Sequence, residues 1–138
     1  MIKFFKDIYS FYKLKLNESN YKVGFFCENN FIFEYLEPYI FNKSKKNEVL
    51  ILSFENIENN LIKKKNFFVF YTNFFREFVF LTLRLKILYT STPDLDHSIF
   101  KKSKFSKCKY VYLSHTPVSL TMIYNDNSFD SFDAVQCT

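Results

Sequence analysis

Residues 109–115, Lys-Tyr-Val-Tyr-Leu-Ser-His, decide the fold class that this sequence predicts. The run from Tyr110 to Ser114 is apolar, short and unbroken, which is typical of a strand buried on both faces of a parallel sheet. It ends on His115 and a Thr-Pro turn, so the sequence predicts a histidine at the carboxyl end of a strand. Ligands of open α/β sheets bind beyond these strand ends.

Five further apolar runs of similar length predict the remaining strands of the same sheet. Segments with helical periodicity or turn composition separate them, and this alternation predicts a doubly wound, Rossmann-like α/β fold with a parallel sheet. Pro38 lies inside one helical segment and predicts a kink or an earlier helix end. The predicted strands cover residues 21–27, 48–54, 66–71, 85–90, 110–114 and 134–137, and the predicted helices cover residues 1–16, 31–40, 74–83 and 117–124.

The length and composition predict one folded domain. At 138 residues the chain is long enough for a single core, and a hydrophobic fraction of 48% excludes the disordered class. We expect an amphipathic helix at residues 1–16 and a single Rossmann-like domain at residues 17–138, truncated before a second lobe. Gly24 is the only glycine, so neither the dinucleotide fingerprint nor a P-loop can be written, and we expect no cofactor.

The net charge and the cysteine spacing indicate which partners and which cellular compartment to expect. A formal net charge of +5 favours anionic partners. The three cysteines are odd in number and lack a Cys-x-x-Cys spacing, which indicates neither a disulfide framework nor a metal site, and we expect reduced thiols in the cytoplasm. The longest apolar region, residues 67–89, is interrupted by charged residues, which makes a membrane-spanning helix too costly.

The predicted helix at residues 1–16 has one aromatic side and one lysine-rich side. Two interpretations stay open for it. It lies on an anionic membrane surface with its aromatic side in the headgroup layer, or it packs against the sheet of its own domain. The apolar side comprises Met1, Phe4, Phe5, Ile8, Phe11, Tyr12 and Leu16, and the opposite side comprises Lys3, Lys6, Asp7, Ser10 and Lys13.

Two polar segments lie between the fourth and fifth predicted strands. Residues 92–97 hold Asp94, Asp96 and His97, which would suit a polyol or a metal, although an aspartate after a proline is more often a turn residue. The spacing matches no established metal site, so none is predicted. A basic stretch follows at residues 101–109, and since no nucleic-acid-binding module accompanies it, we expect no specific nucleic-acid partner and favour a solvated loop.

His115 and the hydroxyls after it are the main chemical candidates. An imidazole with a pKa near its ordinary value of about 6.5 is suited to take a proton from a hydroxyl at neutral pH. The alternative is a strand-end histidine that only hydrogen-bonds to neighbouring backbone. Thr116 and Ser119 precede or begin a predicted helix, whose N–H groups would receive a phosphate or carboxylate, and such hydroxyls are otherwise plain helix caps.

A family resemblance is carried by three segments near the end of the sequence. They are Tyr110-Val-Tyr-Leu-Ser-His-Thr-Pro-Val-Ser, Met122-Ile123-Tyr124 and Ser128-Phe129-Asp130-Ser131-Phe132-Asp133. Together they resemble the amino-terminal domain of CDP-glycerol glycerophosphotransferases, the teichoic-acid polymerase and primase group. The turn at residues 92–96 is similar to one that precedes this strand in some members. Ser114 and Thr116 depart from the family pattern, which has Trp before and Gly after the histidine.

The resemblance implies two Rossmann-like lobes in the glycosyltransferase B arrangement, of which this chain is the acceptor-side one. It implies transfer of glycerol phosphate from CDP-glycerol to a hydroxyl of a polyol or lipid-linked acceptor in cell-surface polymer synthesis. His115 would be the base on that hydroxyl. The further residues implied are Asp94 and Asp96 as orienters and Ser114, Thr116 and Ser119 as polar contacts. The family holds the donor mainly in its carboxyl-terminal lobe, so we expect this chain to be inactive without a partner lobe.

Two hypotheses of different classes follow. The first is this acceptor-side domain of a transferase. The second is a non-catalytic α/β module that binds an anionic partner or a membrane surface through its basic loop and its first helix. In either case we expect a cytoplasmic protein, with peripheral contact to the inner face of the membrane.

Overall fold

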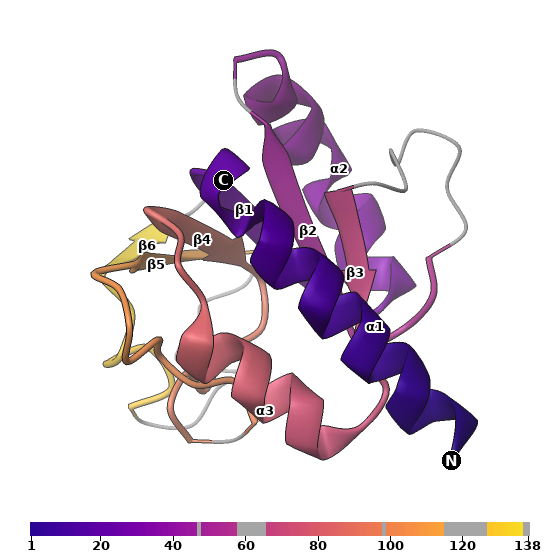
Figure 1. The fold of residues 1–138 in the computed structure, drawn as a ribbon. Coiled ribbons are helices and arrows are strands. Elements are labelled where there is room, and N and C mark those ends of the chain that lie inside the picture. The colour runs from indigo at the N-terminus through magenta and orange to yellow at the C-terminus, as the bar shows by residue number, and fades with distance from the viewer. Residues whose placement is uncertain (47, 58–65, 98, 115–126, 137–138) are drawn as a thin grey trace.

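Six parallel strands form one sheet in the centre of the molecule, in the order β3-β2-β1-β4-β5-β6 (Figure 1). The computed structural model describes residues 1–46, 48–57, 66–97, 99–114 and 127–136. Both the predicted fold class and the six predicted strands are confirmed. The strands are β1 (Val23–Cys27), β2 (Val49–Ser53), β3 (Phe67–Val69), β4 (Ile87–Thr90), β5 (Lys109–Leu113) and β6 (Ala134–Gln136).

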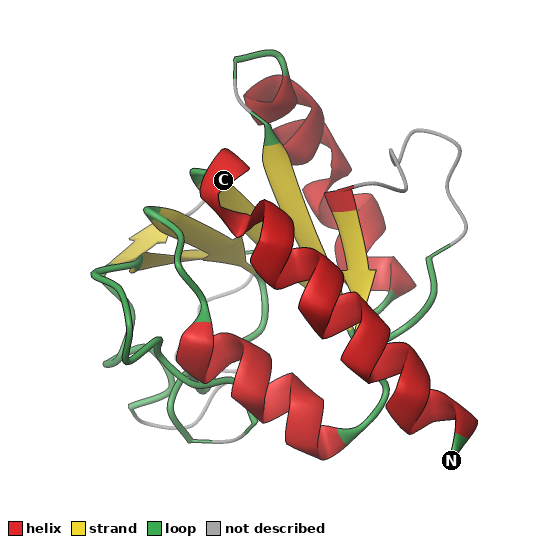
Figure 2. Cartoon of the chain, viewed as in Figure 1, coloured by secondary structure: helices red, strands yellow, loops and turns green. Residues whose placement is uncertain are grey.

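Three α-helices cover the two faces of the sheet. Helices α1 (Ile2–Asn17) and α3 (Asn73–Thr82) lie on one face, and α2 (Asn30–Ser44) lies on the other (Figure 2). Helix α2 continues past Pro38, so the predicted earlier end of this helix is wrong. Leu36 and Ile40 are buried on either side of the proline, and their packing outweighs the one backbone hydrogen bond that proline removes. The helix predicted at 117–124 lies outside the described residues.

Burial on both faces explains why the strands read as unbroken apolar runs. Phe25 and Phe26 are consecutive in β1 and are both fully buried. Since successive side chains of a strand point to opposite faces, Phe25 joins the core cluster with α2, and Phe26 joins the cluster beneath α1 and α3. A doubly covered parallel sheet requires this composition.

Helix α1 packs on the sheet through a side that its hydrophobic pattern does not predict. Asp7 and Leu14 are fully buried, whereas Phe5 and Tyr12 on the predicted apolar side are more than half exposed. Phe11 is the member of that side that packs against the core in part. The helix therefore contacts its own domain, as one of the two interpretations expects, but its aromatic side faces outward.

The buried carboxylate of Asp7 accounts for this orientation. It accepts hydrogen bonds from the backbone N–H of Tyr71 at 2.9 Å, and from the backbone N–H and hydroxyl of Thr72 at 2.8 and 2.6 Å. Thr72 is the N-cap residue of α3, and its own side chain makes no capping bond. Asp7 thus ties the N-cap residue of α3 and the residue before it to α1, which fixes the rotation of α1.

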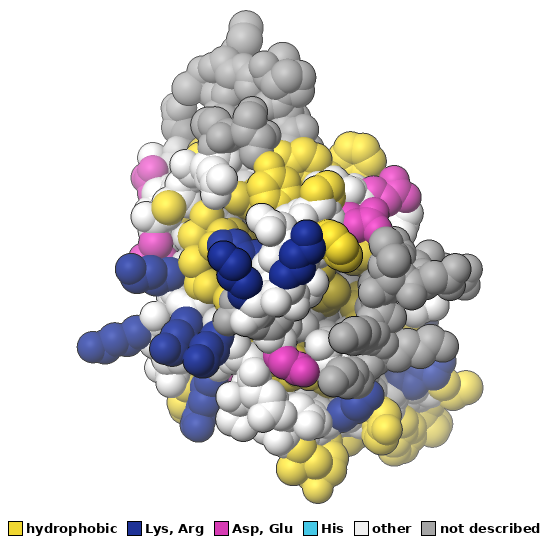
Figure 3. Space-filling model, turned by 90° about the horizontal axis from the view of Figure 1, so that it is seen from above, with side chains coloured by type: hydrophobic (Ala, Val, Ile, Leu, Met, Phe, Trp, Pro, Cys, Tyr) yellow, Lys and Arg dark blue, Asp and Glu magenta, His cyan; other side chains and the backbone are white. Residues whose placement is uncertain are grey.

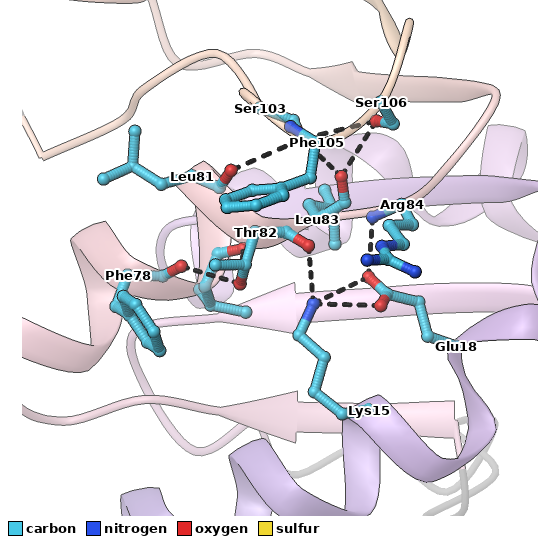
Figure 4. Close-up of polar contacts among 11 residues, drawn as sticks. Lys15, Glu18, Phe78, Leu81, Thr82, Leu83, Arg84, Ser103, Phe105 and Ser106 are labelled. Atoms are coloured by element: carbon cyan, nitrogen blue, oxygen red, sulfur yellow. Dashed lines mark hydrogen bonds and ion pairs between the residues drawn. The ribbon is translucent and has the colours of Figure 1, made fainter.

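The other end of α1 is held by a second polar network (Figure 4). Lys15 Nζ lies 2.9 Å from a carboxylate oxygen of Glu18 and donates to the carbonyl of Thr82 at 2.7 Å. The second Glu18 oxygen accepts from the backbone N–H of Arg84 at 2.7 Å. The hydroxyl of Ser106 donates to the carbonyl of Leu83 at 2.9 Å. These bonds satisfy carbonyls that the end of α3 leaves without helical partners.

Burial lowers the pKa of the Lys15 ammonium, and this effect is opposed by the hydrogen bond to Glu18.

Within the described residues, no helix is long and apolar enough to cross a membrane.

Candidate functional site

The order of the strands places a topological switch point between β1 and β4. Strand β1 pairs with β2 on one side and with β4 on the other, so the chain leaves β1 in one direction and later returns to build the sheet in the other. In sheets of this kind, the connections that follow the two central strands diverge and leave room for ligands beyond the carboxyl ends. The tips of β1 and β4 are therefore the first place to look for a site.

Two polar side chains meet at this switch point. Glu28 directly follows β1, and its Oε2 accepts a hydrogen bond of 3.3 Å from the hydroxyl of Thr92, which follows β4. The backbone N–H of Thr92 donates to the hydroxyl oxygen of Thr90 at 3.0 Å, which shapes the turn after β4. Asn29 caps α2 by accepting from the N–H of Ile32 at 3.0 Å.

The tip of β5 is held beside these residues by hydrogen bonds from two other elements. The buried hydroxyl of Ser91 donates to the carbonyl of Leu113 at 2.6 Å, and the hydroxyl of Tyr35 in α2 donates to the carbonyl of Ser114. The backbone N–H of Ser114 donates to the backbone carbonyl of Gln136 in β6 at 3.0 Å. We call Glu28, Ser91, Thr92 and Ser114 the switch-point cluster.

The other half of the same edge is closed by side chains. Arg76 Nε donates to the carbonyl of Phe70 at 2.9 Å, and its Nη2 donates to the carbonyl of Phe54 at 3.2 Å. The guanidinium also lies 4.4 Å from the centroid of the Phe54 ring. Together with Asp7, this arginine satisfies backbone groups at the tips of β2 and β3.

The predicted site residues are described only in part. His115, Thr116 and Ser119 lie outside the described residues. Ser114 is buried, with 4% of its surface exposed, and its backbone N–H and carbonyl are both bonded to protein. Its position at the carboxyl end of β5 agrees with the sequence expectation, and in the sequence His115 comes next.

Asp94 and Asp96 form a turn, which the sequence indicates as their more common role. Both have positive φ, at 60° and 71°, in the left-handed region that aspartate tolerates better than most residues. The carbonyl of Asp94 accepts from the N–H of His97 at 3.1 Å. The carboxylate of Asp96 accepts from the N–H of Lys102 at 2.7 Å, so it orders the start of the basic stretch. Among the described contacts of these two residues, none joins one carboxylate to the other.

The chemistry of the switch-point cluster suits a hydroxyl better than a phosphate. Glu28 places a carboxylate beside the first turn of α2, whose Ile32 N–H is already capped by Asn29, and a carboxylate repels a phosphate. A carboxylate and a threonine hydroxyl are good partners for the hydroxyls of a polyol. Cys27 offers no nucleophile, because it is fully buried and burial raises the pKa of its thiol far above the ordinary value.

Among the residues that the structure describes, no group of three or more His, Cys, Asp or Glu side chains is placed to hold a metal ion. Of the residues that shape the site, Tyr35 is absent from those that the sequence singles out, whereas Glu28 and Ser91 are indicated by position only and without a chemical role. Glu28 and Ser91 stand at predicted strand tips, which is a signal for their position. Their partners depend on the order of the strands, which local sequence does not encode.

The fold alone does not assign a reaction, because doubly wound sheets carry many unrelated functions. A function therefore has to reside in particular side chains, such as those of the switch-point cluster and those that follow β5 in the sequence. No family model, no curated protein and no solved structure matches this chain.

Proposed function

We propose that this chain is the acceptor-side domain of a transferase that resembles the CDP-glycerol glycerophosphotransferases. The observation that carries the proposal is the bond between Glu28 and Thr92 at the switch point. It offers hydroxyl-binding groups next to the tip of β5, from which the sequence continues directly into His115. The resemblance of the segment around His115 supplies the reaction.

In the proposed reaction, His115 takes the proton of an acceptor hydroxyl. The acceptor oxygen then forms a bond to the phosphorus that carries the glycerol of CDP-glycerol. The bond from that phosphorus to the bridging oxygen breaks, and CMP leaves with the electron pair. Glu28 and Thr92 would hold neighbouring hydroxyls of the acceptor, so that the reacting oxygen is positioned before the donor arrives.

The donor is proposed to bind elsewhere. Charge on a transferring phosphoryl group needs cationic or N–H partners, whereas the switch-point cluster presents a carboxylate. We therefore assign the donor to a partner lobe, either in the same polypeptide or in a separate chain. A cell-surface polymer on a lipid carrier would be the acceptor, which places the reaction at the inner face of the membrane.

Binding of the acceptor can be tested without the donor. The probe is glycerophosphoglycerol, added to the ¹⁵N-labelled chain and followed by NMR. We expect shifts at the amides of Glu28, Thr92 and Ser114, and Glu28→Gln should weaken binding by about tenfold because it replaces a charge-assisted hydrogen bond. The matched control is Glu55→Gln, which changes an exposed glutamate at the tip of β2. Shifts elsewhere, or equal weakening in the control, would contradict the proposal.

A test of the role of His115 requires the complete transfer reaction. With a donor-binding lobe added and CDP-glycerol as donor, transfer of glycerol phosphate to glycerophosphoglycerol should be lost in His115→Ala. Binding of the acceptor alone should change little in this variant, since a base acts on the step rather than on affinity. Unchanged turnover would remove His115 from the mechanism.

A further inference from the structure

A groove separates the lysine-rich side of α1 from β3, which forms one edge of the sheet. Helix α1 contacts β3 and runs alongside it (Figure 1). The groove has a volume of about 350 Å³, which is within the range of pockets that bind small molecules. We call it the edge groove. Lys6, Tyr9, Ser10 and Lys13 line it on the side of α1, and β3 and Tyr71 line it on the other side.

The four residues of α1 share one face of the helix, because they are spaced at i, i+3, i+4 and i+7. Lys6 and Lys13 are therefore two turns apart, about 10 Å along the helix axis, with Ser10 between them. Lys6 is exposed, and Lys13 is half-buried with its Nζ atom 5.8 Å from the centroid of the Phe68 ring. Lysine side chains are long and flexible, so both ammonium groups can reach one ligand in the groove.

In the described part of the chain, no carboxylate forms an ion pair with either lysine of the groove. Asp7, the one acidic residue of α1, is bonded instead to backbone N–H groups where β3 leads into α3. The other polar side chains of the groove are the hydroxyls of Tyr9, Ser10 and Tyr71, which can donate hydrogen bonds. Two ammonium groups beside hydroxyl donors suit an oxyanion such as phosphate.

The backbone of Val69 adds a further donor. The N–H of Phe70 donates to the carbonyl of Ser53 in β2 at 3.0 Å, so the backbone groups of Phe70 point into the sheet. Since backbone groups of successive strand residues point in alternate directions, those of Val69 and Tyr71 point away from β2. The N–H of Tyr71 agrees with this, because it donates to Asp7 of α1. In the described sheet, β3 has no strand on that side, so the N–H of Val69 is directed toward the groove.

Aromatic rings give the groove an apolar lining beside these donors. Phe68 is 2% exposed and forms its buried part, whereas Tyr9 is 68% exposed and lies at its rim. Phe67 and Tyr71 are partly buried on the side of β3. Aromatic side chains bind flat rings by stacking, so the groove suits a ligand that carries a ring next to its phosphate.

Other occupants of the groove are less well matched. Lysine and arginine side chains are spread over the surface seen in Figure 3, so anions are attracted to the protein in general, but this attraction does not select a ring. Lysines beside an edge strand hinder its pairing with another sheet, which argues against a second copy of the chain. A peptide strand would find few backbone bonds, because β3 has only 3 residues.

We propose that the edge groove binds a small soluble molecule in which a phosphate is joined to a flat ring, the chemistry of a nucleoside monophosphate. Lys6, Lys13 and the N–H of Val69 bind the phosphate, and the ring lies against Tyr9 and Tyr71. The groove belongs to the outer strand β3, whereas the switch-point cluster lies at the tips of β1, β4 and β5. The proposal rests on this groove alone and holds whether or not the domain is part of a transferase.

The probe is AMP, added to the ¹⁵N-labelled chain and followed by NMR. Adenosine and inorganic phosphate are the matched control ligands, because each lacks one half of AMP. We expect AMP to shift the amides of Ser10, Val69 and Tyr71. It should bind about tenfold more tightly than either control ligand, since only AMP uses both the donors and the rings.

Removal of the two charges should weaken the binding of AMP. We expect Lys6→Gln with Lys13→Gln to weaken it by about tenfold or more, because both charge-assisted hydrogen bonds are lost. The matched control is Lys45→Gln with Lys46→Gln, which makes the same change of net charge at exposed positions after α2. Lys6→Gln alone changes only an exposed side chain and should weaken binding by about threefold, which keeps the test valid if the double variant unfolds.

Removal of one ring should affect AMP and spare inorganic phosphate. Tyr9→Ser is expected to weaken the binding of AMP by about threefold to tenfold through the loss of stacking, and to leave that of inorganic phosphate nearly unchanged. The matched control is Tyr12→Ser, at a residue of α1 that is 64% exposed and does not line the groove. Circular dichroism should show both variants folded, because both side chains are exposed.

Three results would overturn the proposal. The first is the absence of shifts at the amides of Ser10, Val69 and Tyr71 with AMP. The second is binding of inorganic phosphate that is as tight as that of AMP, since the rings would then play no part. The third is equal weakening by the control variant at Lys45 and Lys46, which would mean that net charge alone attracts the ligand.

Discussion

The carboxylate of Asp7 and the hydroxyl of Thr72 are joined by a hydrogen bond of 2.6 Å across a separation of 65 residues. This bond, with the two backbone bonds beside it, locks α1 to the start of α3. An acidic residue in the middle of an amphipathic helix would ordinarily face solvent. Here it is fully buried, and the aromatic side chains of the same helix are displaced outward.

Asp7→Ala should lower the free energy of unfolding by about 2–5 kcal/mol, because the partly buried N–H groups of Tyr71 and Thr72 lose their acceptor. Asp7→Asn should cost less, since its amide oxygen still accepts one bond. Urea unfolding measures both. Glu34→Ala removes an exposed carboxylate of α2 and should change stability by less than about 0.5 kcal/mol. A loss in Asp7→Ala no larger than in this control would show that the carboxylate does not hold α1.

Lys15→Met should destabilise the protein by about 1–3 kcal/mol, because it removes the bonds to Glu18 and Thr82 and leaves the Glu18 carboxylate buried. Combined with Glu18→Gln, the loss should be less than additive, as expected for two groups in one network. Lys22→Met, at an exposed lysine, is the control. Strict additivity in thermal or urea unfolding would mean that the pair in Figure 4 contributes no coupling.

Gly24→Ala should destabilise the sheet by about 1–3 kcal/mol through overpacking. An added Cβ would lie 2.5 Å from Leu85 Cδ1 and 3.1 Å from Leu88 Cδ1. Both atoms end flexible side chains, so the fold should persist with these leucines shifted. Ser19→Ala, at an exposed position, is the comparison. Equal urea midpoints for the two variants would show that the core beneath α1 and α3 has room for a methyl group.

The fold should lose stability at alkaline pH. Burial raises the pKa of the Cys108 thiol from 9.0 to about 12. A raised folded-state pKa contributes stability that is fully present below pH 9.0 and is lost as pH rises toward 12, because the unfolded chain ionises first. Burial raises the pKa of Tyr110 as well, so Cys108→Ala should reduce the loss without removing it. Urea unfolding at neutral and alkaline pH measures the loss of stability in wild type and in Cys108→Ala. Identical dependence of stability on pH in the two proteins would contradict this role of Cys108.

Cys27 should resist alkylation by iodoacetamide in the folded protein at neutral pH. The residue is fully buried at the end of β1, and burial raises the pKa of its thiol, so the reactive thiolate is scarce. Peptide mapping by mass spectrometry, with and without urea, gives the rate at this residue. Labelling that is as fast in the folded state as in urea would mean that the end of β1 opens readily.

The strands could be predicted because a sheet covered on both faces requires apolar residues at successive strand positions. Phe25 and Phe26 are both buried, one on each face, so the local run is apolar throughout. The orientation of α1 could not be predicted in this way. Its periodicity places Phe5 and Tyr12 inward, and only the distant N–H groups of Tyr71 and Thr72 explain why Asp7 is inside instead.

The candidate site could likewise be predicted only in part. The position of Ser114 at a strand end follows from the length of one apolar run, and the turn at Asp94 and Asp96 follows from the proline before it. The bond between Glu28 and Thr92 joins residues 64 positions apart. It exists because β4 returns to pair with β1, and nothing near either residue encodes that pairing.

The central place of β1 also governs how the protein is made. The ribosome produces β1 first among the strands, and β2 and β3 can add to one of its edges soon afterwards. The other edge has no partner until β4, which ends at Thr90, has left the exit tunnel. A nascent chain that is released before this point carries an open, apolar strand edge, which is a template for aggregation. Emergence of β4 is thus a condition for covering the second edge of β1.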